Sequence, residues 1–297
     1  MDCNAELAQF LRSRRERMSP EQAGLSGQVL EQAGAPPRNG RRRVPGLRRE
    51  EVAALAGVSV DYYVRMERGR RLNVSEAVLD ALARALRLDA TEHAHLFDLA
   101  QPARSRGRRP ARPQQVRAGL HQLLATLERT PALVLGRRLD VLASNRMARA
   151  LLTDFDALPH RERNMVRFLF RDEASRSLYR HWDTVAAELV ASLRRDAGRH
   201  PDDPQLAELV DELSAHDGNF RRWWADHDVH QRTHGTKHFR HPLAGEFRLG
   251  YEALVPPDDP DQRLVVYTAE SGSAAERALA LLDTSTRGPQ VTARTGL

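Results

Sequence analysis

Apolar residues recur every three or four positions through most of residues 5–100, which is the spacing of amphipathic helices. Polar residues mark two of the starts: Ser75 stands where an N-cap is expected, and Asp89 with Glu92 has the spacing of a capping box. The pattern predicts five helices, at 5–17, 47–56, 60–68, 75–86 and 91–100. Between the first two lies a long and irregular insertion, 19–46. The first hundred residues therefore predict an all-α domain.

The pattern changes in the second part of the chain, where helical stretches alternate with short runs typical of strands. We expect helices within 116–129, 145–155, 177–198, 202–216 and 273–284, and strands within 131–145, 245–256 and 263–271. Residues 101–113 mix Pro, Gly and Arg without periodicity, as in a solvated linker. The last segment, 285–297, is expected to be disordered. The predicted fold class is multidomain, with an all-α domain at 5–100 and an α+β domain at 114–284.

Charge is distributed unevenly between these two parts. Residues 1–113 carry a net charge of +7 and residues 114–297 a net charge of −1, so the basic excess lies in the helical part. A basic segment joined to a near-neutral one is typical of a polyanion-binding module with a second function attached. The single cysteine, Cys3, excludes a disulfide framework. We find no apolar run of membrane-spanning length and no secretory signal, so we expect a cytoplasmic protein without membrane contact.

The spacing of small and apolar residues within 49–68 fits a helix-turn-helix motif. Ala53 stands where two helices must cross closely, and Gly57 stands where the turn needs a positive φ. Ser59 can cap the second helix and Gly69 can end it. Apolar residues at Val52, Ala56, Val58, Tyr63 and Met66 pack the two helices together.

The outward face of the second helix is the candidate reader of bases in the major groove of double-stranded DNA. Arg65 and Arg68 can each donate two hydrogen bonds to a guanine edge, while Asp61 can accept from cytosine or only complement the helix dipole. The predicted base-contacting residues are Ser59, Val60, Asp61, Tyr62, Arg65 and Arg68. The predicted phosphate-contacting residues, which orient a protein without reading sequence, are Arg41, Arg42, Arg43, Arg48 and Arg49.

Two long stretches resemble one family of regulators. VPGLRREEVAALAGVSVDYYVRMERGRR and the helices after it are similar to the repressor-like (Cro/CI or Xre type) DNA-binding domain of MmyB-like regulators. FRRWWADHDV, GTKHFRHPLAGEFRLGYEAL and the segment 260–282 resemble the C-terminal ligand-binding domain of that branch. The resemblance implies a PAS-like second domain, a sheet with helices around an apolar cavity. It also implies an ion pair between Glu67 and Arg14 or Arg15, and it does not account for the insertion.

Several residues of the second domain could contact a ligand or a metal. Trp223, Trp224, His227 and Tyr251 are the candidates for lining a cavity, although ordinary core packing explains the aromatic ones equally well. His227, His230 and His234 would share one helical face if the segment were a helix, which is a plausible metal arrangement. Gly235 and Thr236 argue against that helix, so we expect no metal and no cofactor.

These observations predict a bacterial transcriptional regulator that is not an enzyme. It binds double-stranded DNA as a homodimer and senses a small lipophilic ligand through its second domain. Two alternatives remain open on the sequence: a His/Asp metal-dependent hydrolase with a DNA-targeting domain, and a regulator controlled by a partner protein. The sequence contains no catalytic motif for hydrolysis, phosphate transfer or dinucleotide binding.

Overall fold

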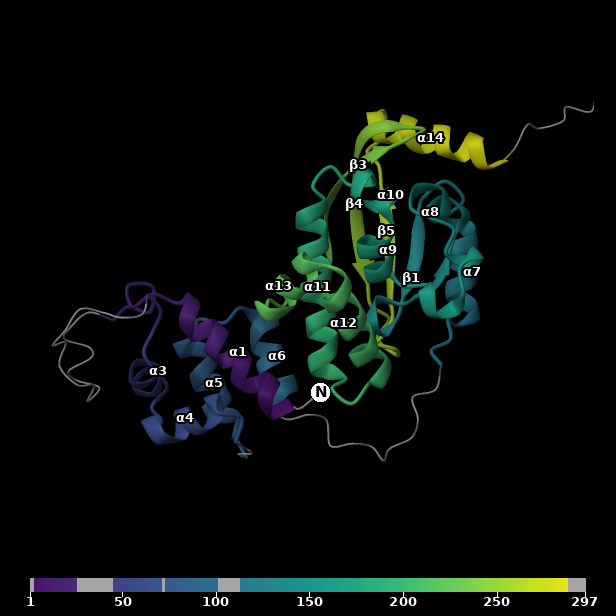
Figure 1. Ribbon diagram of the computed structural model, residues 1–297. Coiled ribbons are helices and arrows are strands. Elements are labelled where there is room, and N and C mark those ends of the chain that lie inside the picture. Colours follow the sequence, from purple (N-terminus) through teal and green to yellow (C-terminus); the bar gives the residue numbers. More distant parts are fainter. Residues whose placement is uncertain (1–2, 26–44, 71–72, 101–112, 288–297) are drawn as a thin grey trace, which may run out of the picture. The chain divides into compact units, whose positions relative to one another are not determined.

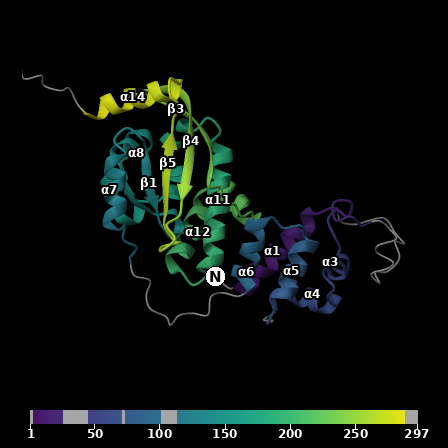
Figure 2. The same ribbon diagram turned by 180° about the vertical axis from the view of Figure 1, so that it is seen from behind.

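The computed structural model describes residues 3–25, 45–70, 73–100 and 113–287, which form two compact units (Figures 1 and 2). Unit 1 comprises Met1–Pro110 and Ala191–Gln231, and unit 2 comprises Ala111–Val190 and Arg232–Leu297. Most of the insertion and of the predicted linker falls outside the described residues. The predicted combination of an all-α part and an α+β part is confirmed.

Unit 1 contains the five helices predicted from the apolar spacing, each within a few residues of its predicted bounds. These are α1 (Cys3–Arg17), α3 (Arg49–Ala56), α4 (Val60–Glu67), α5 (Glu76–Ala85) and α6 (Ala90–Ala100). The predicted capping box is present, because Asp89 Oδ1 accepts from the backbone N–H of Glu92 while Glu92 Oε2 accepts from that of Asp89. Unit 1 also contains α12 (Pro204–His216), α13 (Gly218–Ala225) and the second half of α11 (Trp182–Arg199).

The core of unit 1 is a continuous apolar cluster built on α1. The side chains of Phe10 and Leu11 are fully buried, and α1 contacts both α4 and α6 while α3 contacts α5 (Figure 1). Val229, which follows α13, packs into the same cluster. The segment 191–231 therefore supplies part of the core around the five N-terminal helices, although ninety residues separate it from the last of them in the sequence.

Unit 2 is built on a five-stranded antiparallel sheet with the order β2-β1-β5-β4-β3. Its strands are β1 (Ala132–Leu135), β2 (Val141–Ser144), β3 (His234–His241), β4 (Gly245–Leu254) and β5 (Arg263–Thr268). The strands predicted from alternation are confirmed, and Tyr251 of β4 lies opposite Tyr267 of β5. Two short helices between β2 and β3, α9 (Met165–Arg171) and α10 (Glu173–Leu178), are absent from our predictions because neither shows a clear helical period.

Helices cover the sheet of unit 2 and close its end. The apolar side of α7 (Ala118–Thr126) packs Leu124 against Val134 of β1 and Leu264 of β5. On the other side, Tyr179 after α10 pairs with Phe239 of β3, and their ring centroids are 5.2 Å apart. The last helix, α14 (Ala274–Arg287), contacts β4 and α8 (Arg146–Leu151), and both ribbon views show it at the end of the sheet (Figures 1 and 2). It extends into the first residues of the predicted tail, and residues 288–297 lie outside the described part.

Candidate DNA-binding surface

The turn between α3 and α4 has the geometry that the motif requires. Gly57 ends α3 with φ 65°, in the left-handed region that glycine adopts without strain, and its N–H donates to the carbonyl groups of α3. Ser59 caps α4, because its Oγ accepts from the backbone N–H of Tyr62 at 3.2 Å. Ala53 is fully buried, as the close crossing of the helices demands. The helix-turn-helix predicted from the spacing is therefore present.

The inward face of α4 is fixed by a buried carboxylate. Glu67 accepts from Arg15 Nε at 2.5 Å, from Arg49 Nε at 2.6 Å and from the Tyr63 hydroxyl at 3.0 Å. The Glu67 side chain is completely buried, while that of Arg15 is 8% exposed. A buried carboxylate is tolerated only when it is paired and hydrogen-bonded, so these contacts tie α4 to α1 and α3. Of the two partners that the resemblance allowed, the structure shows Arg15.

The pKa values of this network follow from the same contacts. Burial by itself raises the pKa of Glu67, but the hydrogen bonds from Arg15 and Arg49 outweigh it and lower that pKa below its usual value. Burial likewise lowers the pKa of Arg15, but Glu67 outweighs it and raises that pKa. Burial and the neighbouring Glu67 raise the pKa of the Tyr63 phenol. The carboxylate is therefore ionised and the phenol neutral at physiological pH.

The outward face of α4 presents the side chains that we predicted as base readers. Val60 is 46% exposed, and the Asp61 and Arg65 side chains are 81% and 46% exposed. Arg68 and Ser59 are also exposed, whereas Tyr62 is half-buried against the core. Arg65 Nη1 lies 3.8 Å from Asp61 Oδ2, a contact that in solvent contributes little free energy and leaves the guanidinium available.

The predicted phosphate contacts divide into three groups. Arg48 precedes α3 with its side chain 41% exposed and 3.7 Å from Glu50, so it can reach an external anion. Arg49 is 43% exposed but is already bonded to Glu67, which gives it a structural role that the sequence did not reveal. Arg41, Arg42 and Arg43 lie outside the described residues.

The candidate ligand residues are found in different units. Trp223, Trp224 and His227 belong to unit 1, and Tyr251 belongs to unit 2. The indole of Trp224 lies 3.7 Å from the Arg194 guanidinium, and His227 Nε2 lies 2.8 Å from Gln9 Oε1 of α1. These contacts with α1 and α11 were missed, because nothing in local periodicity reports which distant segment a helix face meets.

Tyr251 of β4 lies among charged neighbours in unit 2. Lys237 Nζ is 5.4 Å from the centre of its ring and 2.6 Å from Glu188 Oε2. Burial, with Glu188 nearby, raises the pKa of the Tyr251 phenol, so this hydroxyl is a neutral donor or acceptor.

A cavity of about 530 Å³ lies between α7 and the start of α8 in unit 2. Its volume is within the range of small-molecule sites. Apolar, polar and charged side chains line it: His121, Leu124, Ala125, Leu127, Glu128, Ser144, Asn145, Arg146 and Arg149. Both arginines of this lining form ion pairs with carboxylates of unit 2, Arg146 with Asp283 and Arg149 with Asp156. Tyr251 is not part of this lining.

The histidines that were candidates for a metal site do not share a helix. The helix α13 ends at Ala225, residues 227–233 have no helical structure, and His234 begins β3. The helical premise of the metal hypothesis is therefore wrong. Over the described ranges, no cluster of three or more His, Cys, Asp or Glu residues is arranged to hold a metal ion.

Two family models match the chain. A helix-turn-helix domain model matches residues 6–96, and a model described as the MmyB-like transcription regulator ligand binding domain matches residues 116–282. The search of curated proteins finds no match. Among the described helices, none is both long and apolar enough to span a bilayer.

Proposed function

Since the chain belongs to the family of transcription regulators with an MmyB-like ligand-binding domain, we propose that it is a cytosolic regulator that reads a specific DNA sequence with α4. The DNA-binding and ligand-binding domains are shared with that family. The finer statements, which concern the bases read, the ligand and the assembly, are the proposal.

The contrast between the two faces of α4 carries this proposal. The inward face is locked by Glu67, so the helix is a rigid support, and the outward face leaves Asp61 and Arg65 accessible. A recognition helix needs both properties, because base contacts discriminate only when the side chains start from a fixed backbone. The same helix used only for protein contacts would have no need of exposed arginines in its last turn and at its C-cap.

Selection of bound fragments from the source genome, at physiological salt, tests the proposal. The full chain should enrich a short motif, and the double variant Arg65→Ala/Arg68→Ala should lose that enrichment while remaining folded. Enrichment of no motif, with binding that only fades as salt rises, would show that the basic surface is an electrostatic anchor without sequence preference.

We further propose that the regulator binds as a homodimer. Two copies would place their recognition helices about 34 Å apart, one turn of the duplex, and would select a pseudo-palindromic motif. An asymmetric single half-site, bound by a monomer in analytical ultracentrifugation, would argue against it.

The proposed ligand is a small lipophilic molecule bound within unit 2. Of the four predicted contacts only Tyr251 belongs to that unit, whereas Trp223, Trp224 and His227 belong to unit 1, so Tyr251 is the contact that we retain. Support for a ligand comes from the match of residues 116–282 to the MmyB-like ligand binding domain model, and its lipophilic character is suggested by the aromatic side chains along the sheet of unit 2, such as Phe239 and Phe247. Native mass spectrometry of the full chain should show a bound mass that disappears on denaturation and is extracted by organic solvent. Bound material that stays in the aqueous phase would contradict the lipophilic assignment.

A further inference from the structure

Arg194, in the second half of α11, is an arginine buried inside unit 1. It is only 2% exposed. Its guanidinium pairs with the Glu6 carboxylate of α1 and donates to the Trp224 carbonyl oxygen, and it stacks on the Trp224 ring. Burial lowers the pKa of Arg194 to about 10, while Glu6 opposes that shift, so the group is charged at physiological pH. A buried guanidinium needs all these partners, which makes the contact with α1 specific.

The residues that follow α13 extend this contact along α1. Arg14 Nη2 donates to the His227 carbonyl oxygen at 2.6 Å, and Arg14 Nη1 lies 3.3 Å from Asp228 Oδ1. Arg17 also pairs with Asp228. Together with the bond between His227 and Gln9, these contacts hold α1 from its first turn to its last.

A second contact joins α11 to α6 of the DNA-binding helices. A methyl group placed at Gly198 would come within 2.5 Å of the His95 ring, so the α11 backbone lies directly on that side chain. His95 is 1% exposed and meets Phe10 of α1 edge to face. The second half of α11 thus packs against both α1 and α6.

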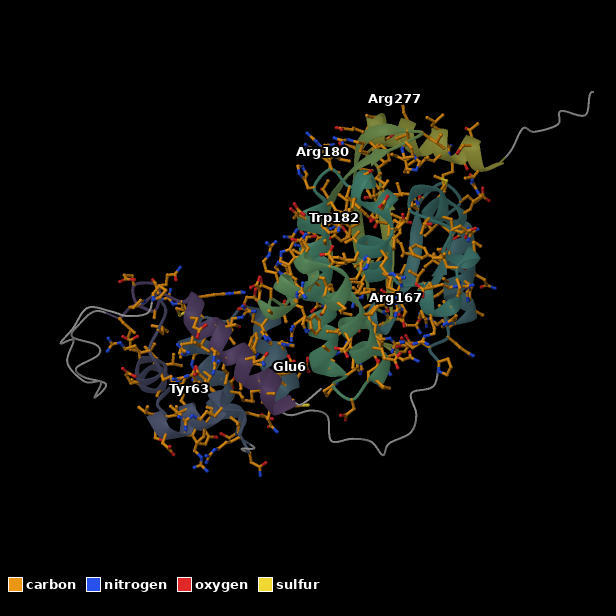
Figure 3. The ribbon with its side chains drawn as sticks, in the orientation of Figure 1. Glu6, Tyr63, Arg167, Arg180, Trp182 and Arg277 are labelled. Atoms are coloured by element: carbon orange, nitrogen blue, oxygen red, sulfur yellow. The ribbon has the colours of Figure 1, made fainter. Side chains whose placement is uncertain are left out.

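The helix α1 connects these contacts to the recognition helix α4. Arg15, the neighbour of Arg14, holds Glu67 of α4, as described above. Glu6 on α1 and Tyr63 on α4, which donates to the same Glu67, are both labelled in Figure 3. A displacement of α1 therefore changes the position of Arg15 and with it the anchor of α4.

We propose that Arg194 is a positioning residue for DNA recognition, which acts through Glu6 and α1 on the recognition helix. Arg194 lies within the ligand-binding match, residues 116–282, and α11 contributes its first half to unit 2 and its second half to unit 1. A change in α11 is thereby communicated to α4 with no direct contact between Arg194 and DNA. This inference rests on the proposed function for its consequence, and on the contacts of unit 1 for its mechanism.

The test compares Arg194→Gln with wild type in the full chain, on the selected genomic fragment and on random DNA. The neutral side chain leaves Glu6 without its cation, so we expect affinity for the selected fragment to fall by about fivefold or more, within the usual range of coupling between sites. Affinity for random DNA should change by less than about twofold, because no predicted phosphate contact is lost. Hydrogen exchange should become faster in α1 and in α4.

Three further variants make the result specific. Arg194→Lys keeps the charge and should restore part of the affinity. Glu6→Gln/Arg194→Gln removes both charges and should lose less than the sum of the single losses, since neither group is left buried and unpaired. Arg277→Gln makes the same change at an exposed arginine of α14 (Figure 3) and should behave as wild type.

Stoichiometric titration of the active fraction separates positioning from simple unfolding. If Arg194→Gln lowers the active fraction but leaves the affinity of the folded molecules unchanged, the positioning role is overturned. Unchanged affinity together with unchanged exchange in α4 overturns it as well. If the wild type selects no DNA, the proposed function fails, and the exchange of α4 amides in Arg194→Gln still decides whether Arg194 positions that helix.

Discussion

At the scale of single residues, the arginines around the helix-turn-helix have separate tasks that their exposure reveals. Arg15 is buried and holds Glu67, Arg49 is half exposed and holds the same carboxylate, and Arg65 points away from this network. A substitution therefore reports on DNA recognition only where the arginine has no structural partner inside the unit. Arg49→Ala would mix both effects, and Arg48 is the cleaner choice for a phosphate contact.

Arg65→Ala and Arg48→Ala should weaken DNA binding in different ways. Loss of a bidentate base contact removes about 1–3 kcal/mol of discrimination, so Arg65→Ala should relax the preference at one base pair of the selected motif. Loss of a phosphate contact should weaken selected and random DNA alike and reduce the slope of log K against log salt by about one. Binding titrations at several salt concentrations measure both. Equal losses on both DNAs for both variants would contradict the assigned roles.

Glu67→Gln should destabilise unit 1 strongly. The amide cannot balance the buried Arg15 charge, and breaking a buried ion pair from one side costs about 3 kcal/mol. Asp61→Asn, on the exposed side of the same helix, is the matched control and should change the free energy of unfolding by less than about 1 kcal/mol. Urea denaturation followed by tryptophan fluorescence measures both. Similar stabilities for the two variants would mean that the Glu67 network is not the anchor of α4.

At the scale of elements, the angle between α3 and α4 depends on one residue in the left-handed region. Gly57 has φ 65°, and a Cβ built there meets no heavy atom within 4 Å. The requirement for glycine is therefore conformational and not steric. Gly119 in α7 also has open space around its Cβ position, but no positive φ.

Gly57→Ala should lower the free energy of unfolding by about 1–2 kcal/mol, the cost of a left-handed conformation for an L-residue. Gly57→Asn should cost less, because asparagine tolerates that region. Gly119→Ala should instead stabilise unit 2 by about 0.5–1 kcal/mol, because it replaces glycine inside a helix. Thermal unfolding of the three variants checks the contrast. If Gly57→Ala is as stable as wild type, the left-handed conformation at this position does not require glycine.

At the scale of the whole molecule, two buried histidines lie where segments distant in the sequence meet inside unit 1. Burial, followed by the nearby charge of Arg194 and Arg14, lowers the pKa of His95 and of His227 to about 3. His227 and Arg195 add to the effect at His95, and Arg17 adds to that at His227 while Asp228 opposes it. Both rings are therefore neutral in the folded state near neutral pH.

These pKa values predict acid sensitivity with a definite sign. The unfolded chain takes up a proton on each ring below about pH 6.5, and the folded chain does not. The free energy of unfolding therefore has its full value above that pH and falls as the pH decreases toward 3. Between pH 7 and pH 5 each ring should account for a loss of up to about 2 kcal/mol in the free energy of unfolding. His95→Phe keeps a ring against Phe10 but cannot be protonated, so its stability should fall less over this interval. Urea unfolding at both pH values measures the change in the free energy of unfolding with pH. If this change is the same in His95→Phe as in wild type, protonation of His95 is not its cause.

The helix-turn-helix, the three helices around it, most strands of the second part and the family resemblance could all be predicted from the sequence. These are local properties: apolar spacing fixes which face of a helix is buried, and Gly57 and Ser59 fix where one helix ends and the next begins. The exposed face of α4, which we propose to read the bases, follows from the same spacing, because its inward residues leave only one face free.

Which distant segments meet could be learned only from the folded structure. It selected Arg15 over Arg14 as the partner of Glu67, assigned Arg49 to the same carboxylate, and brought Arg194 onto Glu6 from a segment 188 residues away. It also placed His227 to His234 outside any helix, so the shared helical face on which the metal hypothesis was based is not formed. The physical reason is that a charged or aromatic side chain gives the same local pattern whatever it contacts. Its partner is set by packing and by the need to pair buried charge, which involve the whole chain at once.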